Sequence, residues 1–346
     1  MKHALWSILV LMVMATTDPS KASAAKYTLL EFSDLLGWQQ DDHDRALHVF
    51  LQTCSINKTG DWSALCKFAK TKPNAKSYFE TFFRPVLIED GKPALFTGYF
   101  EPELNGSLTQ TARFRYPLYR KPPEVRSGSS WLTRRQIEET GALAGRGLEL
   151  VWVDDPVELF FLQIQGSGRI RLTNGRMMRV GYGGSNNRNY RSIGQELIRR
   201  GVYSKHQVSA QVIQNWVRRN PRLGAELLRH NPSFVFFRKI TKVPADKGPI
   251  GAMNRSITGG RTVAVDPKFT PLGAPVWLEK TGHDVIRRLM VAQDTGSAIK
   301  GAQRADIFYG SGDQAGRAAG KVRDTGRMVV LMPVQQAFEL VPEALQ

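Results

Sequence analysis

The stretch that decides the fold runs from Thr262 to Gly312. It reads TVAVDPKFTPLGAPVWLE over 262–279 and MVAQDTGSAIKGAQRADIFYGSG over 290–312. Short apolar runs alternate here with turns rich in glycine and proline. This pattern is typical of a small β-barrel built from many short strands, and not of a parallel α/β sheet. Three of the runs have an aspartate at their edge, namely Asp266, Asp294 and Asp306.

These three aspartates are the first candidates for chemistry. Carboxylates at strand ends, beside loops, lie where an enzyme places its acids and bases. Aspartate also suits turns for a purely structural reason, because its side chain accepts hydrogen bonds from nearby backbone amides. The residue types alone leave both interpretations open.

The first residues predict export. Met1-Lys2-His3 is a basic start, Ala4–Ala15 is almost wholly apolar and Ala22-Ser23-Ala24 has the form of a cleavage site, so 1–24 is predicted to be a signal peptide. The apolar run is shorter than the ~20 residues of a membrane span, and an uncleaved anchor or a buried first helix is the alternative. No cysteine precedes Cys54, so we expect no lipidation there. The expected product is an exported, periplasmic protein that is soluble or peripheral to the outer membrane.

Charge and cysteine content narrow the function classes. A net charge of +17 favours a polyanionic partner, which for an exported protein means cell-wall polymers or membrane headgroups sooner than nucleic acid. The basic residues are spread along the chain, so solubility alone is the alternative explanation. Cys54 and Cys66 are candidates for a disulfide in an oxidising compartment. The scattered histidines have no zinc-site spacing, so we expect no metal and no cofactor.

The chain is long enough for two domains. Residues 28–84 are predicted to be mostly helical, with the aromatic side chains of 74–83 in the core. From Phe234 onward strands dominate, so two strand-rich ends flank a mixed middle. The elements predicted between them are a strand at 94–102, strands at 148–153 and within 157–172, a glycine-rich loop at 180–187, and helices that begin at Ser192, Ser209 and Asn220.

Several kinds of site are excluded by spacing. The glycines of 166–168 and 310–312 have neither the dinucleotide fingerprint nor the Walker lysine, which argues against nucleotide binding. No G-x-S-x-G elbow is present for a serine nucleophile, and both cysteines have helical surroundings. Aromatic and amide side chains near glycines fit carbohydrate binding, although strand pairing and turns explain any single one of them: Tyr99, Tyr116, Tyr119, Gln163, Gln165, Tyr182, Asn186 and Asn187.

Short segments along most of the chain resemble the membrane-bound lytic murein transglycosylase A family. They are FTGYFEP at 96–102, FFLQIQGSG at 160–168, VGY at 180–182 and the aspartate region at 264–312. The resemblance implies a mainly β fold with helical additions. It consists of a double-psi β-barrel that carries the catalytic residues, a smaller β-barrel domain inserted into it, and a groove for a glycan strand between the two. The expected boundaries are 25–104 and 241–346 for the catalytic domain with its N-terminal helices, and 105–240 for the insert.

The same resemblance implies a lytic transglycosylase that cleaves the β-1,4 bond between N-acetylmuramic acid and N-acetylglucosamine in peptidoglycan and leaves a 1,6-anhydromuramoyl product. Asp306 in RADIFYG matches the family's single acid/base, Asp294 in QDTG matches its supporting aspartate, and Asp266 matches the third. The expected substrate contacts are Thr97, Gly98, Tyr99, Gln163, Gln165, Gly166, Ser167, Gly168 and Asp266.

Alternatives from other function classes stay open. One is a noncatalytic glycan-binding protein that uses the same groove, and another is a two-carboxylate muramidase with Glu101 or Asp294 as the partner of Asp306. An exported nucleic-acid binder is favoured only by charge. The expected partners are peptidoglycan glycan strands, with no nucleic acid and no stable membrane span. Cell-wall synthesis or division proteins are further partners that the sequence does not identify.

Overall fold

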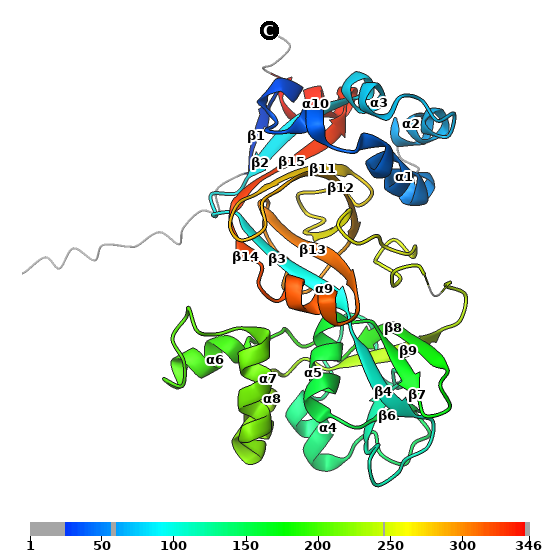
Figure 1. The fold of residues 1–346 in the computed structure, drawn as a ribbon, viewed down its shortest axis with the longest axis vertical. Helices are drawn as coiled ribbons and strands as arrows, with labels where there is room; N and C mark the ends of the chain where they lie inside the picture. Colours follow the sequence, from blue (N-terminus) through cyan, green and yellow to red (C-terminus); the bar gives the residue numbers. More distant parts are fainter. Residues whose placement is uncertain (1–24, 57–59, 245, 343–346) are drawn as a thin grey trace, which may run out of the picture.

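The chain folds around two β-sheets, one above the other in Figure 1. The structure, a computed structural model, describes residues 25–56, 60–244 and 246–342. The predicted signal peptide, residues 1–24, lies outside the described residues. No helix in the described part of the chain is long and apolar enough to cross a bilayer.

The larger sheet has nine strands and curls into a barrel (Figure 1). Most neighbours are antiparallel, but β10 runs parallel to β12, and β13 runs parallel to β3. Inward side chains such as Phe96, Val263, Ala292 and Ile307 fill its interior. In sheet order the strands are β1 (Lys26–Leu29), β2 (Phe83–Glu89), β15 (Gly326–Pro333), β11 (Pro275–Lys280), β12 (Ile286–Asp294), β10 (Thr262–Val265), β13 (Arg304–Ser311), β3 (Leu95–Glu101) and β14 (Arg323–Asp324).

Helices cover one outer face of this barrel, at the top of Figure 1. They are α1 (His43–Thr53), α2 (Trp62–Ala69), α3 (Ala75–Phe82) and α10 (Val334–Leu340), with single turns of 3-10 helix at η1 (Phe32–Asp34), η2 (Trp38–Gln40) and η3 (Cys54–Ile56). The predicted aromatic core is confirmed for Tyr78, Phe79 and Phe83, each at most 1 % exposed, whereas Phe82 is only partly buried against it. The prediction of helix from residue 28 onward is wrong at its start, because β1 (Lys26–Leu29) pairs with β2 as an edge strand. A disulfide joins Cys54 to Cys66 and ties the end of α1 to α2.

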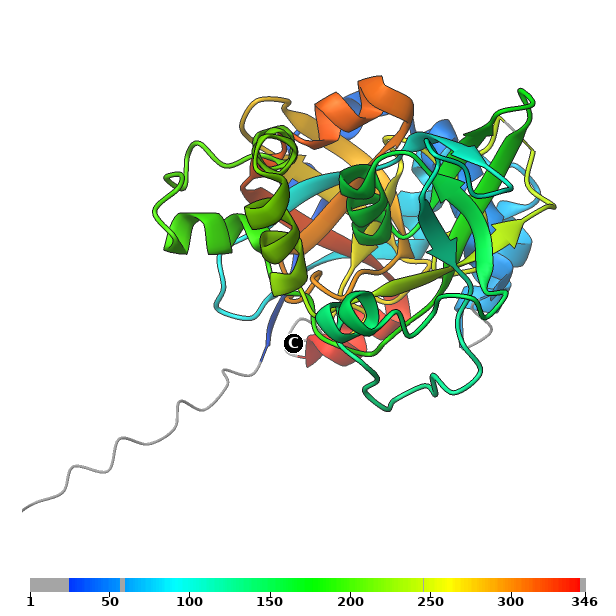
Figure 2. The same cartoon turned by 90° about the horizontal axis from the view of Figure 1, so that it is seen from below.

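The smaller sheet has six strands, all of which lie between β3 and β10 in chain order. In sheet order they are β5 (Tyr116–Tyr119), β6 (Glu149–Val153), β4 (Glu103–Ser107), β7 (Gly168–Leu172), β8 (Met177–Ser185) and β9 (Val235–Ile240). The helices around it are α4 (Arg134–Thr140), α5 (Pro156–Gln165), α6 (Ile193–Arg199), α7 (Ala210–Arg219) and α8 (Pro221–His230). Seen from below, this part, drawn mostly in green, lies across the barrel (Figure 2).

Two sequence-based predictions in this region are wrong. Residues 157–165 form helix α5 and not a strand, because Asp155 caps the amides of Val157 and Glu158, Pro156 occupies the first turn, and Gly166 ends the helix in the left-handed conformation. The loop predicted at 180–187 is mostly strand, since β8 continues to Ser185 with a register shift between Tyr182 and Gly184. The helix starts at Ser192 and Ser209 are confirmed, because each hydroxyl accepts a backbone amide of the first turn.

Gly98 in β3 lies where two backbones meet. A Cβ atom at this position would stand 2.7 Å from Ala319 Cα and 2.9 Å from the Ala319 oxygen, at the end of α9 (Gly312–Ala319). Gly98→Ala is therefore expected to lower the free energy of unfolding by about 2 kcal/mol, because backbone atoms must move apart. Urea denaturation measures the change. Gly181→Ala is the matched control with a smaller expected effect, since it meets only the side chain of Ile240; equal effects for both would contradict the argument.

Candidate active site

Four side chains form one row across four neighbouring strands of the barrel. Ala264 on β10 pairs with Asp294 on one side and Asp306 on the other, and Asp306 pairs in turn with Thr97 on β3. Side chains at paired positions stand on the same face of a sheet. The two aspartates therefore face the same way, with their backbones about two strand spacings, or ~10 Å, apart. The residue between them, Ala264, is small and is 4 % exposed.

A β-bulge turns Asp294 into this row. The register of β10 against β12 pairs Val263 with Ala292 and then Ala264 with Asp294, so that Gln293 is skipped. Without this shift, Asp294 would follow Ala292 by two positions and share its inward direction. The skipped Gln293 is buried, and its amide nitrogen donates to the Val49 oxygen at 3.0 Å, which fixes the bulge.

Asp306 is half-buried and has one direct hydrogen-bond donor. The Thr97 hydroxyl donates to Asp306 Oδ1 at 2.5 Å, and Arg304 Nη2 donates to Thr97 Oγ1 at 2.8 Å. Burial raises the pKa of Asp306 above its ordinary value, and the charge of Asp294 acts in the same direction, while Thr97 and Arg304 oppose the shift. This environment favours a carboxyl group that holds its proton.

Asp294 has three donors. Tyr99 Oη donates to Oδ2 at 2.8 Å, and the backbone amides of Ala252 and Thr295 donate to Oδ1 at 3.0 Å each. Burial raises the pKa of Asp294, but all three hydrogen bonds lower it. Burial and the Asp294 charge also hold the pKa of Tyr99 well above its ordinary value, so Tyr99 remains a donor. The contrast in donors makes Asp294 the better carboxylate and Asp306 the better acid.

Both aspartates open onto a cavity of about 750 Å³ between the barrel and the smaller sheet, which we call the groove. Asp294 and Asp306 are its acidic residues among those described. The smaller sheet and its helices contribute Arg134, Gln163–Ser167, Gly181, Tyr182, Ser185, Arg188, Tyr190, Asn231, Ser233, Val235 and Arg238, and the barrel side contributes Pro249–Ala252, Asn254 and Thr295–Ile299.

The residues predicted as substrate contacts fall into separate groups. Gln163, Gln165, Gly166 and Ser167 line the groove together with the two aspartates. Thr97 and Tyr99 donate hydrogen bonds to the two carboxylates and are not among the residues that line the groove. Gly98 packs against α9, and Gly168 against Leu162 and Pro102, where in both cases a Cβ atom would clash. The two glycines therefore have a packing role in this geometry.

Asp266 does not join the other two aspartates. It is 7 % exposed, and its carboxylate accepts the amides of Lys268 at 3.2 Å and Gly301 at 3.0 Å. It is not among the residues that line the groove. Its geometry is that of a turn aspartate which ties the end of β10 to the chain before β13.

Glu101, the alternative second carboxylate, is fully engaged elsewhere. It is 1 % exposed and pairs with Arg169 at 2.9 Å and Arg179 at 3.4 Å, while the Ser311 hydroxyl donates to it at 2.6 Å. Arg169 and Arg179 belong to the smaller sheet and Ser311 to the barrel. Glu101 thus joins the two parts of the molecule and does not line the groove.

Sequence reasoning missed some residues of the site. Arg304 stands two positions before Asp306 on the same strand, and period-two alternation was a usable signal for it. The Ala252 amide and the side chain of Arg134 carry no signal of this kind. No group of three or more His, Cys, Asp or Glu side chains within the described ranges is arranged to hold a metal ion.

Comparison with known proteins agrees with this architecture. Two family models match, "MltA specific insert domain" over residues 95–238 and "3D domain" over residues 261–332. A relative from Vibrio cholerae, named membrane-bound lytic murein transglycosylase A, is 29 % identical over 373 residues, which are 92 % of this chain and 98 % of the relative.

Solved structures give the same result. The membrane-bound lytic murein transglycosylase from Agrobacterium tumefaciens is 32 % identical, with a TM-score of 0.80 over 91 % of this chain and 99 % of that one. Escherichia coli MltA with bound chitohexaose is 29 % identical, with a TM-score of 0.70 over 86 % and 90 % of the two chains. These likenesses confirm the predicted fold class, a double-psi β-barrel domain with a smaller inserted domain and a groove between them. The chain therefore belongs to the membrane-bound lytic murein transglycosylase A family.

Proposed function

We propose that this protein is an enzyme that cleaves the glycan strands of peptidoglycan as a lytic transglycosylase, the activity that its relatives' names carry. The observation that supports this proposal most is the pairing of unlike aspartates in the groove. Burial raises the pKa of both carboxyl groups, but Asp306 has one direct donor and Asp294 has three that favour its ionised form. A groove with one proton-holding acid and one carboxylate suits cleavage of a glycosidic bond.

The first step uses Asp306 as the acid. Its proton passes to the glycosidic oxygen between N-acetylmuramic acid and N-acetylglucosamine, and the bond from that oxygen to C1 of the muramic acid breaks. The N-acetylglucosamine side leaves with a new hydroxyl group. Asp294, whose three donors favour its ionised form over the opposing effect of burial, stabilises the positive charge that develops at C1.

The second step uses the same residue as the base. The Asp306 carboxylate takes the proton of the C6 hydroxyl of the same muramic acid, whose oxygen bonds to C1 and closes the 1,6-anhydro ring. No water enters, and Asp306 regains its proton. One carboxyl group suffices because the nucleophile is already tethered, and well-oriented intramolecular attack has a high effective molarity.

Product mass tests this reaction directly. Purified protein is incubated with peptidoglycan sacculi, and the released fragments are analysed by mass spectrometry. The transglycosylase gives fragments lighter by one water molecule than those of a muramidase digest, with no reducing end. Reducing ends would favour a two-carboxylate muramidase with Asp294 as partner, and intact strands with bound protein would favour a noncatalytic binder.

The pH dependence of the rate follows from the raised pKa of Asp306. The acid must be protonated at the start, so the rate is expected to fall as the pH rises through that pKa, which gives an optimum on the acidic side. Arg304 lowers the pKa of Asp306, so Arg304→Gln is expected to move the alkaline limb to higher pH. Initial rates of fragment release between about pH 4 and about pH 8 measure the limb. A limb that stays in place would contradict the assignment of Asp306.

Two further proposals concern the cellular location of the protein and the boundaries of its domains. The relatives are named membrane-bound, and the described helices include no membrane span, so we propose an exported protein that associates peripherally with a membrane. We also propose the domain boundaries 25–104 with 241–346 for the catalytic domain and 105–240 for the insert. The bounds of β4 and β9, which begin the insert at Glu103 and end it at Ile240, support this division to within two residues.

A further inference from the structure

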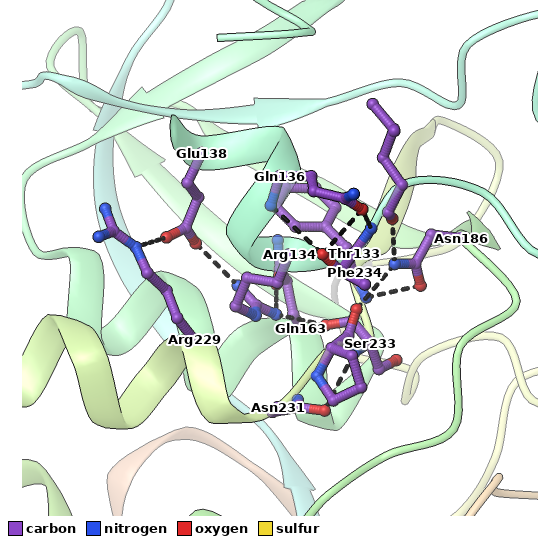
Figure 3. A network of polar contacts seen from close by, with 12 residues as sticks. Thr133, Arg134, Gln136, Glu138, Gln163, Asn186, Arg229, Asn231, Ser233 and Phe234 are labelled. Atoms are coloured by element: carbon purple, nitrogen blue, oxygen red, sulfur yellow. Dashed lines mark hydrogen bonds and ion pairs between the residues drawn. The ribbon is translucent and has the colours of Figure 1, made fainter. Parts of the chain in front are cut away.

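Arg134 is a buried cation in the wall of the groove. It begins α4, is 4 % exposed, and its guanidinium lies over the rings of Phe160 and Phe234, 4.6 and 5.1 Å from their centroids. Its Nη1 reaches Glu138 at 3.4 Å on one side, and its Nη2 donates to the Ser233 oxygen at 2.9 Å on the other (Figure 3). Burying a charge at this depth is costly unless the charge is paired and hydrogen-bonded.

The second acceptor of Arg134 Nη2 is the side-chain oxygen of Gln163 (Figure 3). A guanidinium has only donors, so the glutamine must turn its oxygen toward Arg134 and its amide nitrogen away. That nitrogen donates to no acceptor among the described residues, and it is not fully enclosed. Gln163 lines the groove, so an accessible donor without a partner stands in its wall.

The side chain of Gln165 is held in the same way as that of Gln163, with its oxygen engaged and its amide nitrogen free to donate. Its side-chain oxygen accepts the backbone amide of Phe100 at 3.2 Å, and in the described structure its amide nitrogen has no acceptor. Gln165 also lines the groove. A glutamine free to rotate can donate or accept, but internal donors fix both of these side chains as donors.

We propose that Arg134 is a positioning residue that fixes Gln163 as a hydrogen-bond donor toward a carbonyl or carboxylate oxygen of the bound glycan. The proposal rests on the proposed function for the identity of that glycan. Acetamido groups and the carboxylates of stem peptides both offer such oxygens, and a sugar hydroxyl does not require a donor of fixed polarity. The wall thereby selects N-acetylated or acidic strands over plain glucans.

Gln163 also borders a second cavity of about 1080 Å³ beside α4 and α5, which Arg134 and Gln163 separate from the groove. That cavity carries the carboxylates of Asp155 and Glu158, both already paired with Arg218. The other two carboxylates that line it, Glu138 and Asp154, are paired with Arg229 and Arg113. The inference concerns the groove side of the wall.

The main test is an isosteric change of polarity. Gln163→Glu keeps an oxygen for Arg134 and replaces the amide nitrogen by a second oxygen. Calorimetric binding is measured in the full-length Asp306→Asn protein, which prevents turnover, with chitohexaose, cellohexaose and peptidoglycan strands. We expect Gln163→Glu to weaken chitohexaose binding by about tenfold, because two acceptors then face each other, with cellohexaose changed by less than about twofold.

The matched control is Gln136→Glu on α4. Gln136 forms a capping box with Thr133 on the exposed side of the helix, where glutamate serves equally well. No change in binding is expected from it. If Gln163→Glu weakens the binding of both chitohexaose and peptidoglycan, the acceptor is the acetamido carbonyl. If it weakens the binding of peptidoglycan alone, the acceptor is a carboxylate. Unchanged binding of both ligands overturns the proposal.

Arg134→Lys tests the positioning role itself. A lysine provides one ammonium group and no planar fork, so Gln163 regains its freedom to rotate. We expect the preference for chitohexaose over cellohexaose to fall about tenfold, with a higher KM for peptidoglycan and a nearly unchanged kcat. If Arg134 had only a structural role, Arg134→Lys would weaken the binding of chitohexaose and of cellohexaose equally. Binding that follows these expectations in a protein that releases no anhydro fragments would overturn the proposed reaction and leave this inference standing.

Discussion

Replacing Asp306 by Asn is expected to lower the rate of anhydro-fragment release by about 10³-fold or more, the range for loss of a general acid that also serves as the base. Asn has the same shape and still accepts the Thr97 hydroxyl, so the row of side chains across the barrel stays in place. It has no proton to give to the leaving oxygen. Mass spectrometry of fragments released from sacculi, at matched protein concentration, measures the loss.

The same substitution has an expected effect on stability, and its sign follows from the raised pKa. A carboxyl with a folded pKa above its unfolded value contributes stability below the unfolded pKa and loses that contribution as the pH rises through the folded pKa. At neutral pH, Asp306→Asn is therefore expected to leave the thermal midpoint unchanged or raised. Asp313→Asn, on the exposed first turn of α9, is the matched control with full activity. Wild-type rates in Asp306→Asn would remove Asp306 from the mechanism.

The second large effect is expected at Glu101. Glu101→Ala should lower the free energy of unfolding by about 3 kcal/mol or more, because it leaves the buried guanidinium of Arg179 without its carboxylate. The contacts that this substitution removes lie at the junction between the two sheets. Arg169 and Arg179 belong to the smaller sheet, and Glu101 stands at the end of β3 in the barrel. Urea denaturation followed by tryptophan fluorescence measures it.

Glu103→Ala is the matched control for Glu101. Glu103 pairs with Arg171 at the surface, where both side chains are partly exposed, so its loss is expected to cost less than about 1 kcal/mol. Similar costs for the two substitutions would mean that the junction is held by other contacts. A reduced glycan affinity for Glu101→Ala is also expected, because the groove lies between the two parts that this residue joins.

Local signals in the sequence were sufficient for much of the fold. The strands of 262–333 were predicted because glycine and proline turns separate β-branched runs, and Ser192 and Ser209 marked helix starts by their capping chemistry. Helix α5 was misread because the polar and apolar residues of 162–165 alternate like a strand. The decisive signal was Asp155-Pro156 before it, a cap followed by a residue suited to a first turn.

The candidate site was only partly accessible to the same reasoning. Asp294 and Asp306 stood out by residue type, and their proximity in the barrel followed from a family resemblance. The bulge at Gln293 depends on contacts with α1, and the contact from Arg134 to Gln163 joins separate helices. Neither has a local sequence signal, because both are set by how distant elements pack. Asp266 resembles Asp294 and Asp306 in its sequence context. It differs from them in its contacts, because its carboxylate accepts the amide of Gly301.

The division of labour between the two sheets has an evolutionary consequence. Thr97, Ala264, Asp294 and Asp306 are all borne by the barrel, whereas Gln163 and Gln165 come from the segment that interrupts it. Under the proposed function, the residues for the reaction and those for ligand choice are encoded in separate stretches of the gene. Recombination that exchanges only the interrupting segment between homologues would then transfer the preference for a particular wall polymer from one protein to another. The catalytic residues of the barrel would stay unchanged.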